Sequence, residues 1–154
     1  MTIVGSRRST AYGRRTAEAL AAQMAIRGIT VVSGLAFSID GASHRGALEA
    51  SGDTIAVLSS GVDLIQLASH RRLGERVVRE GLLLSEFLPG EPARPHHFPR
   101  RNRILAALGG AVVVVEAAEK SGVLITVEHT LDLGRDVYAV PGALDAPQSR
   151  DATH

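Results

Sequence analysis

The residues with the clearest potential for chemistry lie in one stretch, from Arg94 to Leu105. This stretch holds four arginines, two histidines and one phenylalanine, and it contains no acidic residue. Pro99 suits the first turn of a helix, where the missing backbone N–H of proline costs nothing. Three arginines in the opening turns oppose the helix macrodipole, so they favour anion binding rather than helix stability. Guanidinium groups and free backbone N–H groups both bind phosphate well.

Phe98 gives the same stretch a second kind of contact. The chain holds only three phenylalanines and two tyrosines, and an aromatic ring among arginines can stack against an unpaired nucleobase. Because every base has a stacking face, such a contact predicts binding that is largely independent of base sequence. The alternative interpretation is a solvated basic turn without a ligand, which leaves Phe98 unexplained.

The composition indicates one folded domain. The chain has 154 residues, 45% of them hydrophobic, and a net charge of +1, which excludes a disordered chain and confines any nucleic-acid site to a local patch. Lys120 is the only lysine among 17 basic residues. The absence of cysteine excludes disulfides and thiolate metal sites. No apolar run is long enough to span a bilayer, so a cytoplasmic protein without membrane contact is expected.

Short β-rich runs alternate with helical stretches along the chain. This alternation predicts βαβ units and therefore an α/β fold, a three-layer sandwich in which a mostly parallel sheet of about six strands has helices on both faces. Residues 111–115 are the most β-branched run and are expected to form the central strand. The domain is expected to span residues 1–142, with an irregular polar tail at 143–154. The predicted strands are 2–4, 29–32, 54–58, 82–86, 111–115 and 136–140, and the predicted helices are 10–27, 38–50, 70–80, 99–108 and 121–134.

The turns after the predicted strands carry small, hydroxyl-bearing and basic residues. In an open parallel sheet these turns meet at one edge, where ligands bind. Small residues let backbone N–H groups approach a ligand, and serine hydroxyls can donate to phosphate oxygens. An ordinary turn or helix cap explains any single glycine or serine equally well, but their convergence predicts a binding edge. The candidates are Gly5, Ser6, Arg7, Ser33, Gly34, Leu35, Ala36, Lys120, Ser121 and Gly122, with the acids Glu86 and Glu116 on the same edge.

The sequence contains no pattern that supports a catalytic, cofactor or metal site as strongly as these turns support a binding edge. The first turn reads Gly5-Ser6-Arg7 and so lacks the dinucleotide fingerprint, and neither a Gly-Lys-Ser/Thr phosphate loop nor a Gly-x-Ser-x-Gly elbow occurs. His96-His97 lies in a basic loop that would repel a cation. Asp40 and His44 are four residues apart on a predicted helix, where a hydrogen-bonded pair is a better interpretation than two metal ligands. No catalytic residue, cofactor or metal is therefore expected.

These motifs, in this order, resemble those of the DNA-processing protein A family, also called DprA or Smf. The most distinctive family motif is matched by Phe98-Pro99-Arg100-Arg101-Asn102-Arg103-Ile104. The resemblance covers nearly the whole chain and is specific, because many separate motifs fall in register. The other matches are Gly5-Ser6-Arg7, Ser33-Gly34-Leu35-Ala36, Ile39-Asp40 with Ala42 and His44, Gly46-Ala47-Leu48, residues 54–58, Ser85-Glu86, residues 114–117, Ser121-Gly122 with residues 124–126, and residues 139–142.

The resemblance implies a Rossmann-like domain that binds single-stranded DNA, protects incoming DNA during natural transformation and helps to load RecA onto it. RecA and a second copy of the chain are thus implied as protein partners, although the family's surfaces for both lie largely in sequence that follows the Pro141-Gly142 motif. The DNA pocket is implied to contain Arg7, Ser33, Gly34, Phe98, Arg101, Asn102 and Arg103. Arg100 and the remaining candidates of the binding edge complete the expected DNA-binding set.

The sequence departs from that resemblance at several positions. Phe37-Ser38 replace a residue-glycine pair that usually precedes Ile39, and Val123 stands where a second serine is common. Gln66-Leu67 stand where the family usually has Tyr-Pro, and Asp151-Ala152-Thr153 replace an expected Gly-x-Asn. The alternative function is an enzyme related to the nucleoside-monophosphate phosphoribohydrolases, which share a similar architecture. Those enzymes need a Pro-Gly-Gly-x-Gly-Thr-x-x-Glu signature, whereas residues 120–128 lack the glycine run and have a different threonine-to-glutamate spacing.

Overall fold

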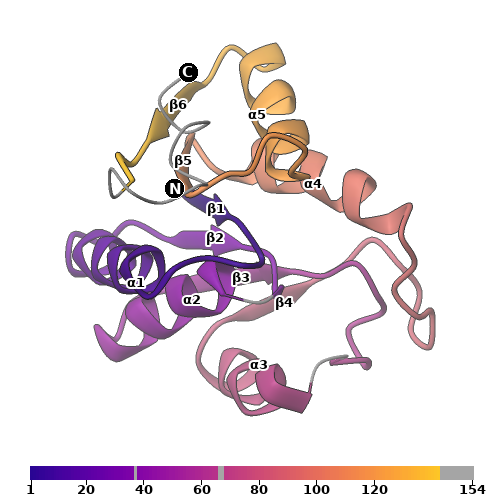
Figure 1. Ribbon diagram of the computed structural model, residues 1–154. Coiled ribbons are helices and arrows are strands. Elements are labelled where there is room, and N and C mark those ends of the chain that lie inside the picture. The colour runs from indigo at the N-terminus through magenta and orange to yellow at the C-terminus, as the bar shows by residue number, and fades with distance from the viewer. Residues whose placement is uncertain (37, 66–67, 143–154) are drawn as a thin grey trace.

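The computed structural model describes residues 1–36, 38–65 and 68–142, and Figure 1 shows its strands and helices. The expected tail at 143–154 and the departures at Phe37 and at Gln66-Leu67 lie outside the described residues. Within the described part, strands and helices alternate as the sequence predicts. The strands are β1 (Thr2–Gly5), β2 (Val31–Ser33), β3 (Thr54–Val57), β4 (Leu82–Leu84), β5 (Ala111–Val115) and β6 (Asp136–Ala139), and the helices are α1 (Ala11–Ile26), α2 (Ile39–Glu49), α3 (Ala68–Glu80), α4 (His97–Leu108) and α5 (Val123–Asp132).

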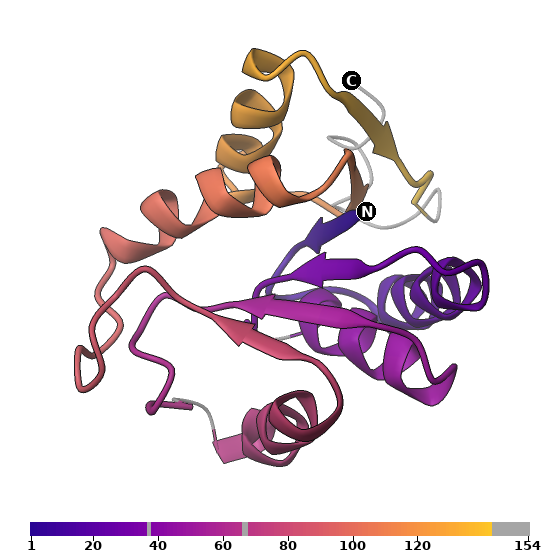
Figure 2. The same cartoon turned by 180° about the vertical axis from the view of Figure 1, so that it is seen from behind.

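The strands form one sheet in the order β4-β3-β2-β1-β5-β6, and every neighbouring pair is parallel. The helices α1, α2 and α3 lie on one side of this sheet, while α4 and α5 lie together on the other side (Figures 1 and 2). The predicted α/β architecture is thereby confirmed. Because the chain runs outward from β1 in one direction and returns to place β5 on its other side, the carboxyl ends of β1 and β5 meet at the topological switch point.

Burial on both faces explains why the inner strands read as continuous apolar runs. In β1, Ile3 packs toward α1 and α2, whereas the next residue, Val4, packs toward α4 and α5. Alternating side chains of β5 divide in the same way, with Val113 on the first side and Val112 on the second. Each fully buried aliphatic side chain stabilises the fold by about 1.5–3 kcal/mol, so these strands fix the edge on which the turns after β1 and β5 stand.

Two local expectations are wrong. Residues 111–115 form β5, which lies second from one end of the sheet, and the middle pair is β1 and β2. A β-branched composition indicates that a strand is buried on both faces, and β1 and β5 are both buried in this way. The order of the strands in the sheet depends instead on how the helical connections cross from one strand to the next. Ser38 does not cap α2 with its side chain; its backbone φ is 75°, and its hydroxyl contacts that of Ser9. Ser9 draws that hydroxyl away from the backbone of the helix.

Candidate functional site

A cavity of about 710 Å³ opens at the carboxyl ends of β1 and β5. Three segments line most of it: the turn after β1, the first two turns of α4, and the turn between β5 and α5. The structure therefore brings most of the predicted site residues to one place. Those that line the cavity are Gly5, Ser6, Arg7, Ala36, Phe98, Arg101, Asn102, Lys120, Ser121 and Gly122.

An arginine–aromatic pair lines this cavity. The guanidinium carbon of Arg7 lies 4.4 Å from the centroid of the Phe98 ring, and that of Arg101 lies 5.7 Å from it. A cation over a ring face is attracted by the ring's quadrupole. Arg7 is exposed and Phe98 is half-buried, so the pair presents a positive charge beside an aromatic surface.

Arg101 is a buried member of the site. Only 6% of it is exposed, and its Nη1 and Nε donate hydrogen bonds to the carbonyl oxygen of Val57 (2.9 Å) and to Oδ1 of Asn102 (3.0 Å). Burial lowers the pKa of Arg101, and the charge of Asp40 acts in the opposite direction. A Cβ at Gly34 would lie 2.4 Å from Nη1 of Arg101, so glycine at this position makes room for the guanidinium. Arg101 thus joins α4 to the end of β3.

Two polar side chains hold the remaining cavity walls. Asn102 Nδ2 donates a hydrogen bond to the carbonyl of Gly122 (3.1 Å), which joins α4 to the turn before α5. In that turn, Ser121 Oγ accepts a hydrogen bond from the backbone N–H of Val123 (3.2 Å). Lys120 is exposed on the same turn. Side-chain hydrogen bonds therefore join the elements that wall the cavity, which carries basic groups on two sides.

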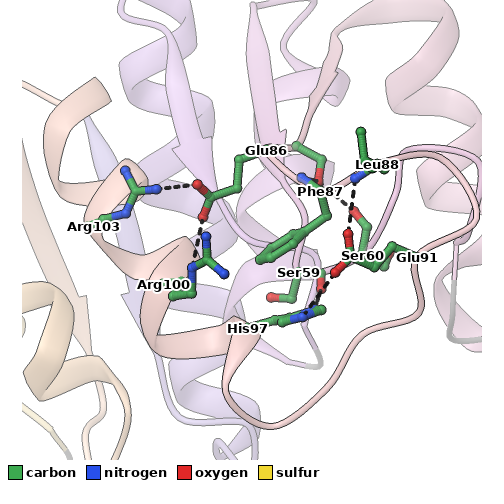
Figure 3. Close-up of polar contacts among 10 residues, drawn as sticks. Ser59, Ser60, Glu86, Phe87, Leu88, Glu91, His97, Arg100 and Arg103 are labelled. Atoms are coloured by element: carbon green, nitrogen blue, oxygen red, sulfur yellow. Dashed lines mark hydrogen bonds and ion pairs between the residues drawn. The ribbon is translucent and has the colours of Figure 1, made fainter.

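Arg100 and Arg103 lie outside the cavity. Both form ion pairs with Glu86, which follows β4, as Figure 3 shows. Successive residues of a helix point about 100° apart, so residues 100 and 103 share one face of α4 and Arg101 projects from another. The structure therefore does not bring these two predicted residues into the cavity, and their charge is partly neutralised by Glu86.

Three further candidates lie behind the cavity wall rather than on it. Ser33 is fully buried, and its hydroxyl lies 2.6 Å from the carbonyl of Ile3 and 3.0 Å from Oδ1 of Asp40. Gly34 makes room for Arg101, as described above. Leu35 faces a second, smaller cavity. The turn after β2 therefore supports the site mainly from behind, and of its described residues, 34–36, only Ala36 reaches the main cavity.

Glu116 has a role that the sequence analysis missed. Its carboxylate accepts hydrogen bonds from the backbone N–H of Thr10 (2.8 Å) and from the Thr10 hydroxyl, at the N-terminus of α1. It is 2% exposed with a backbone φ of 55°, and a Cβ at Gly13 would lie 2.6 Å from its carboxyl carbon. Dinucleotide-binding folds place a pyrophosphate at this helix end, which here holds a carboxylate. The sequence signal that could have revealed this role is an acidic residue directly after a buried strand.

His97 anchors the start of α4, next to Phe98. Its Nδ1 donates a hydrogen bond to the carbonyl of Ser59 (2.9 Å), and its ring stacks on Phe87 with centroids 4.0 Å apart (Figure 3). Nε2 lies 3.5 Å from the Glu91 carboxylate. His97 is thus a core histidine with packing and hydrogen-bonding partners. Among the described residues, no cluster of three His, Cys, Asp or Glu side chains suits a metal ion, and no helix is long and apolar enough to cross a membrane.

Buried His44 makes the stability of the fold depend on pH. A carbonyl only accepts, so the contact of Nε2 with the Gly34 oxygen (2.6 Å) places the imidazole proton on Nε2, while Nδ1 faces the Thr54 hydroxyl (2.7 Å). Burial lowers the pKa of His44 from 6.5, against the opposing effects of Gly34 and Asp40. The contribution of neutral His44 to the free energy of unfolding is therefore expected to be fully present above pH 6.5. Stability is expected to decrease as the pH falls below 6.5, because the unfolded chain then binds a proton that the folded chain excludes.

Urea denaturation between about pH 7.5 and 5.5 measures this effect, whose slope for one proton is at most about 1.4 kcal/mol per pH unit. The pKa of His70 is lowered in the same direction, by burial and by Arg45. His44→Gln is expected to remove the His44 part of the slope. A slope that is the same in the variant would contradict the assignment to His44.

The sequence was compared with models of known protein families. The family described as DNA recombination-mediator protein A matches residues 1–154. The chain belongs to this family. Protein Smf of Escherichia coli is 43% identical over 97% of this chain and 40% of its own length, and a DNA processing protein DprA of Mycobacterium tuberculosis is 47% identical over 96% and 38%. The chain therefore spans about two-fifths of these curated relatives.

Solved structures of the DprA family share the fold closely. DprA from Streptococcus pneumoniae superposes with a TM-score of 0.88 and 38% identity, over 99% of this chain and 53% of that protein. DprA from Helicobacter pylori, whose structure concerns its single-stranded DNA binding mode, gives 0.87 and 29%, over 99% and 68%. A molybdenum cofactor binding protein from Rippkaea orientalis, at 17% identity and a TM-score of 0.69, shares the fold alone. The family resemblance and the Rossmann-like fold are confirmed.

Proposed function

We propose that this chain binds single-stranded DNA in the 710 Å³ cavity. The observation that carries the proposal is the Arg7 guanidinium 4.4 Å over the Phe98 ring, because it places a phosphate-binding group and a stacking surface side by side. Lys120 and the turn from Gly5 to Arg8 supply further donors around the same space. The single-stranded DNA binding mode of the Helicobacter pylori relative supports the same ligand.

The stacking surface selects for an unpaired strand. A base can lie on Phe98 only if its face is free, and a duplex hides the faces of its bases. A titration with short oligothymidine and with a duplex of the same length, at two or more salt concentrations, tests this. The single strand is expected to bind more tightly, with an affinity that falls as salt rises. Equal affinity for the two would count against the proposal.

The wider role follows from family membership. We infer that the chain acts in the cytoplasm on incoming DNA, protects it and assists RecA loading, with RecA and a second copy of the chain as partners. Nuclease protection assays and RecA filament assembly on single-stranded DNA, each with and without this protein, test the two activities. Gel filtration with and without oligothymidine tests the homodimer.

Binding without catalysis is part of the proposal. The phosphoribohydrolase alternative needs a glycine run that residues 120–128 lack. In that segment Thr126 is buried and Glu128 is exposed, so the two side chains do not share one environment. Incubation with nucleoside monophosphates is expected to release no free base, and release at a catalytic rate would overturn this part.

Arg7→Ala separates the binding site from the fold. Arg7 is exposed, so its loss is expected to leave the melting temperature nearly unchanged. If Arg7 neutralises one phosphate, the slope of log affinity against log salt falls by about 0.7. Arg14→Ala is the control, because Arg14 is equally exposed and bonds the Ser9 carbonyl outside the cavity. An unfolded Arg7 variant would show that Arg7 is a structural residue, and equal slopes for the two folded variants would show that Arg7 does not neutralise a phosphate.

A further inference from the structure

The turn after β4 places an acid against the outer face of α4. The carboxylate of Glu86 contacts Nη2 of Arg103 and lies 4.0 Å from Nε of Arg100 (Figure 3). The next residue of the turn is Phe87, and the centre of its ring lies 5.5 Å from the guanidinium carbon of Arg100. We call Glu86, Arg100 and Arg103 the outer trio. Because two cations share one anion, the trio carries one positive charge instead of two.

The outer trio borders the cavity in which the proposed function places DNA. Phe98 and Arg101 line that cavity, and the two arginines of the trio lie on the neighbouring face of the same helical turns. The side chains of Arg100 and Arg103 are 58% and 51% exposed, whereas that of Glu86 is 22% exposed. A strand that extends from the cavity along α4 therefore meets two exposed arginines whose charge a less exposed carboxylate already offsets in part.

Helix stability does not account for this arrangement. Cations in the first turns of a helix oppose its macrodipole, and α4 has no acid in its own first turn. Neutral residues at positions 100 and 103 would remove that cost without any counter-ion from the turn after β4. Exposed ion pairs also add little stability. The trio is better explained by its effect on an anion that approaches α4.

We propose that Glu86 limits the DNA site at the outer face of α4, because it acts as an internal counter-ion for arginines that would otherwise bind a further phosphate. Guanidinium groups bind carboxylates and phosphates through the same N–H donors, so Glu86 and a phosphate compete for Arg100 and Arg103. This inference rests on the proposed function, since it concerns how far the bound strand extends from the cavity. Glu86 thereby keeps the affinity for DNA below the value that the basic residues of α4 allow.

Glu86→Gln tests the inference, because it removes the charge and keeps the size of the side chain. The variant is expected to bind oligothymidine about twofold to fivefold more tightly at low salt. The slope of log affinity against log salt is expected to steepen by about 0.7 for each phosphate newly neutralised. The gain is expected to grow with the length of the oligothymidine, because only a longer strand reaches beyond the cavity. Fluorescence anisotropy over a length series and a salt series measures both quantities.

Two further variants show where the gain comes from. Glu80→Gln is the matched control, because Glu80 pairs with Arg76 (2.7 Å) in the same kind of exposed ion pair but precedes β4, at the opposite end of the strand from Glu86. It changes the net charge equally and is expected to leave affinity and slope unchanged. The addition of Arg100→Ala and Arg103→Ala to Glu86→Gln is expected to return the slope to the wild-type value, because the arginines that gained a phosphate are then absent.

The inference and the proposed function fail by different results. Unchanged affinity and slope in Glu86→Gln, or equal gains in Glu86→Gln and Glu80→Gln, would overturn the inference and leave the proposed function standing. A gain that survives the loss of both arginines would do the same. A lower melting temperature in Glu86→Gln without tighter binding would assign Glu86 to the stability of α4 instead. If neither the wild type nor the variant binds oligothymidine, the proposed function itself is wrong, and this inference with it.

Discussion

Phe98→Ala is expected to weaken the binding of short oligothymidine by about fivefold to 150-fold. The ring is half-buried in the cavity with the Arg7 guanidinium over it, and a base stacked on an aromatic side chain contributes about 1–3 kcal/mol. Because the ring carries no charge, affinity is expected to fall by the same factor at every salt concentration. Fluorescence anisotropy over a salt series measures both the affinity and the slope.

Phe87→Leu is the control for this variant. Phe87 is also an aromatic neighbour of α4, but its ring is 7% exposed and stacks on His97 outside the 710 Å³ cavity. Its replacement is expected to lower the melting temperature, with a smaller effect on binding than Phe98→Ala. If Phe98→Ala lowers the melting temperature and leaves affinity intact, Phe98 is a packing residue and the stacking surface lies elsewhere.

Arg101→Ala is expected to lower the free energy of unfolding by about 2–4 kcal/mol. The guanidinium is 6% exposed and hydrogen-bonds the end of β3 through the Val57 carbonyl. Its removal leaves that carbonyl and Asn102 Oδ1 without their donor, and takes a positive charge away from buried Asp40. Urea denaturation at neutral pH measures the loss. DNA binding should fall in the same variant, because the cavity loses a basic side chain and α4 loses one of the contacts that fix it to the sheet edge.

The preceding residue in the chain provides the comparison. Arg100 is 58% exposed and its Nε lies 4.0 Å from the Glu86 carboxylate, and exposed ion pairs contribute about 0–1 kcal/mol. Arg100→Ala is therefore expected to change stability by less than about 1 kcal/mol. Similar losses in the two variants would mean that Arg101 is not the anchor that its hydrogen bonds indicate.

The place of the main cavity, at the carboxyl edge of the sheet, could be predicted from the sequence. Apolar runs mark the strands, and parallel strands end at one edge, so the turns at Gly5-Ser6-Arg7 and Lys120-Ser121-Gly122 had to meet. The regular alternation of strands and helices left no other arrangement for them. The start of α4 could also be predicted from the sequence, because Pro99 is typical of the first turn of a helix.

The direction of each side chain on α4 could not be predicted in the same way. Helical periodicity separates Arg101 from Arg100 and Arg103, but it does not say which face looks into the cavity. That depends on the angle at which His97 and Phe87 hold the helix, and on Glu86, which arrives from the end of β4. The pairing of Glu116 with Thr10 joins residues that are 106 positions apart, so it cannot be predicted from a local sequence pattern.

The contact between Glu116 and Gly13 has a consequence for how this sequence can change. Any side chain at position 13 would collide with the Glu116 carboxyl group, 2.6 Å from the place of its first carbon. Shortening Glu116 first would leave the Thr10 N–H and hydroxyl without their acceptor. Each substitution is therefore harmful alone, and the two positions must change together. Positions 13 and 116 therefore constrain each other at that helix end, where an internal carboxylate occupies the place that a phosphate takes in dinucleotide-binding folds.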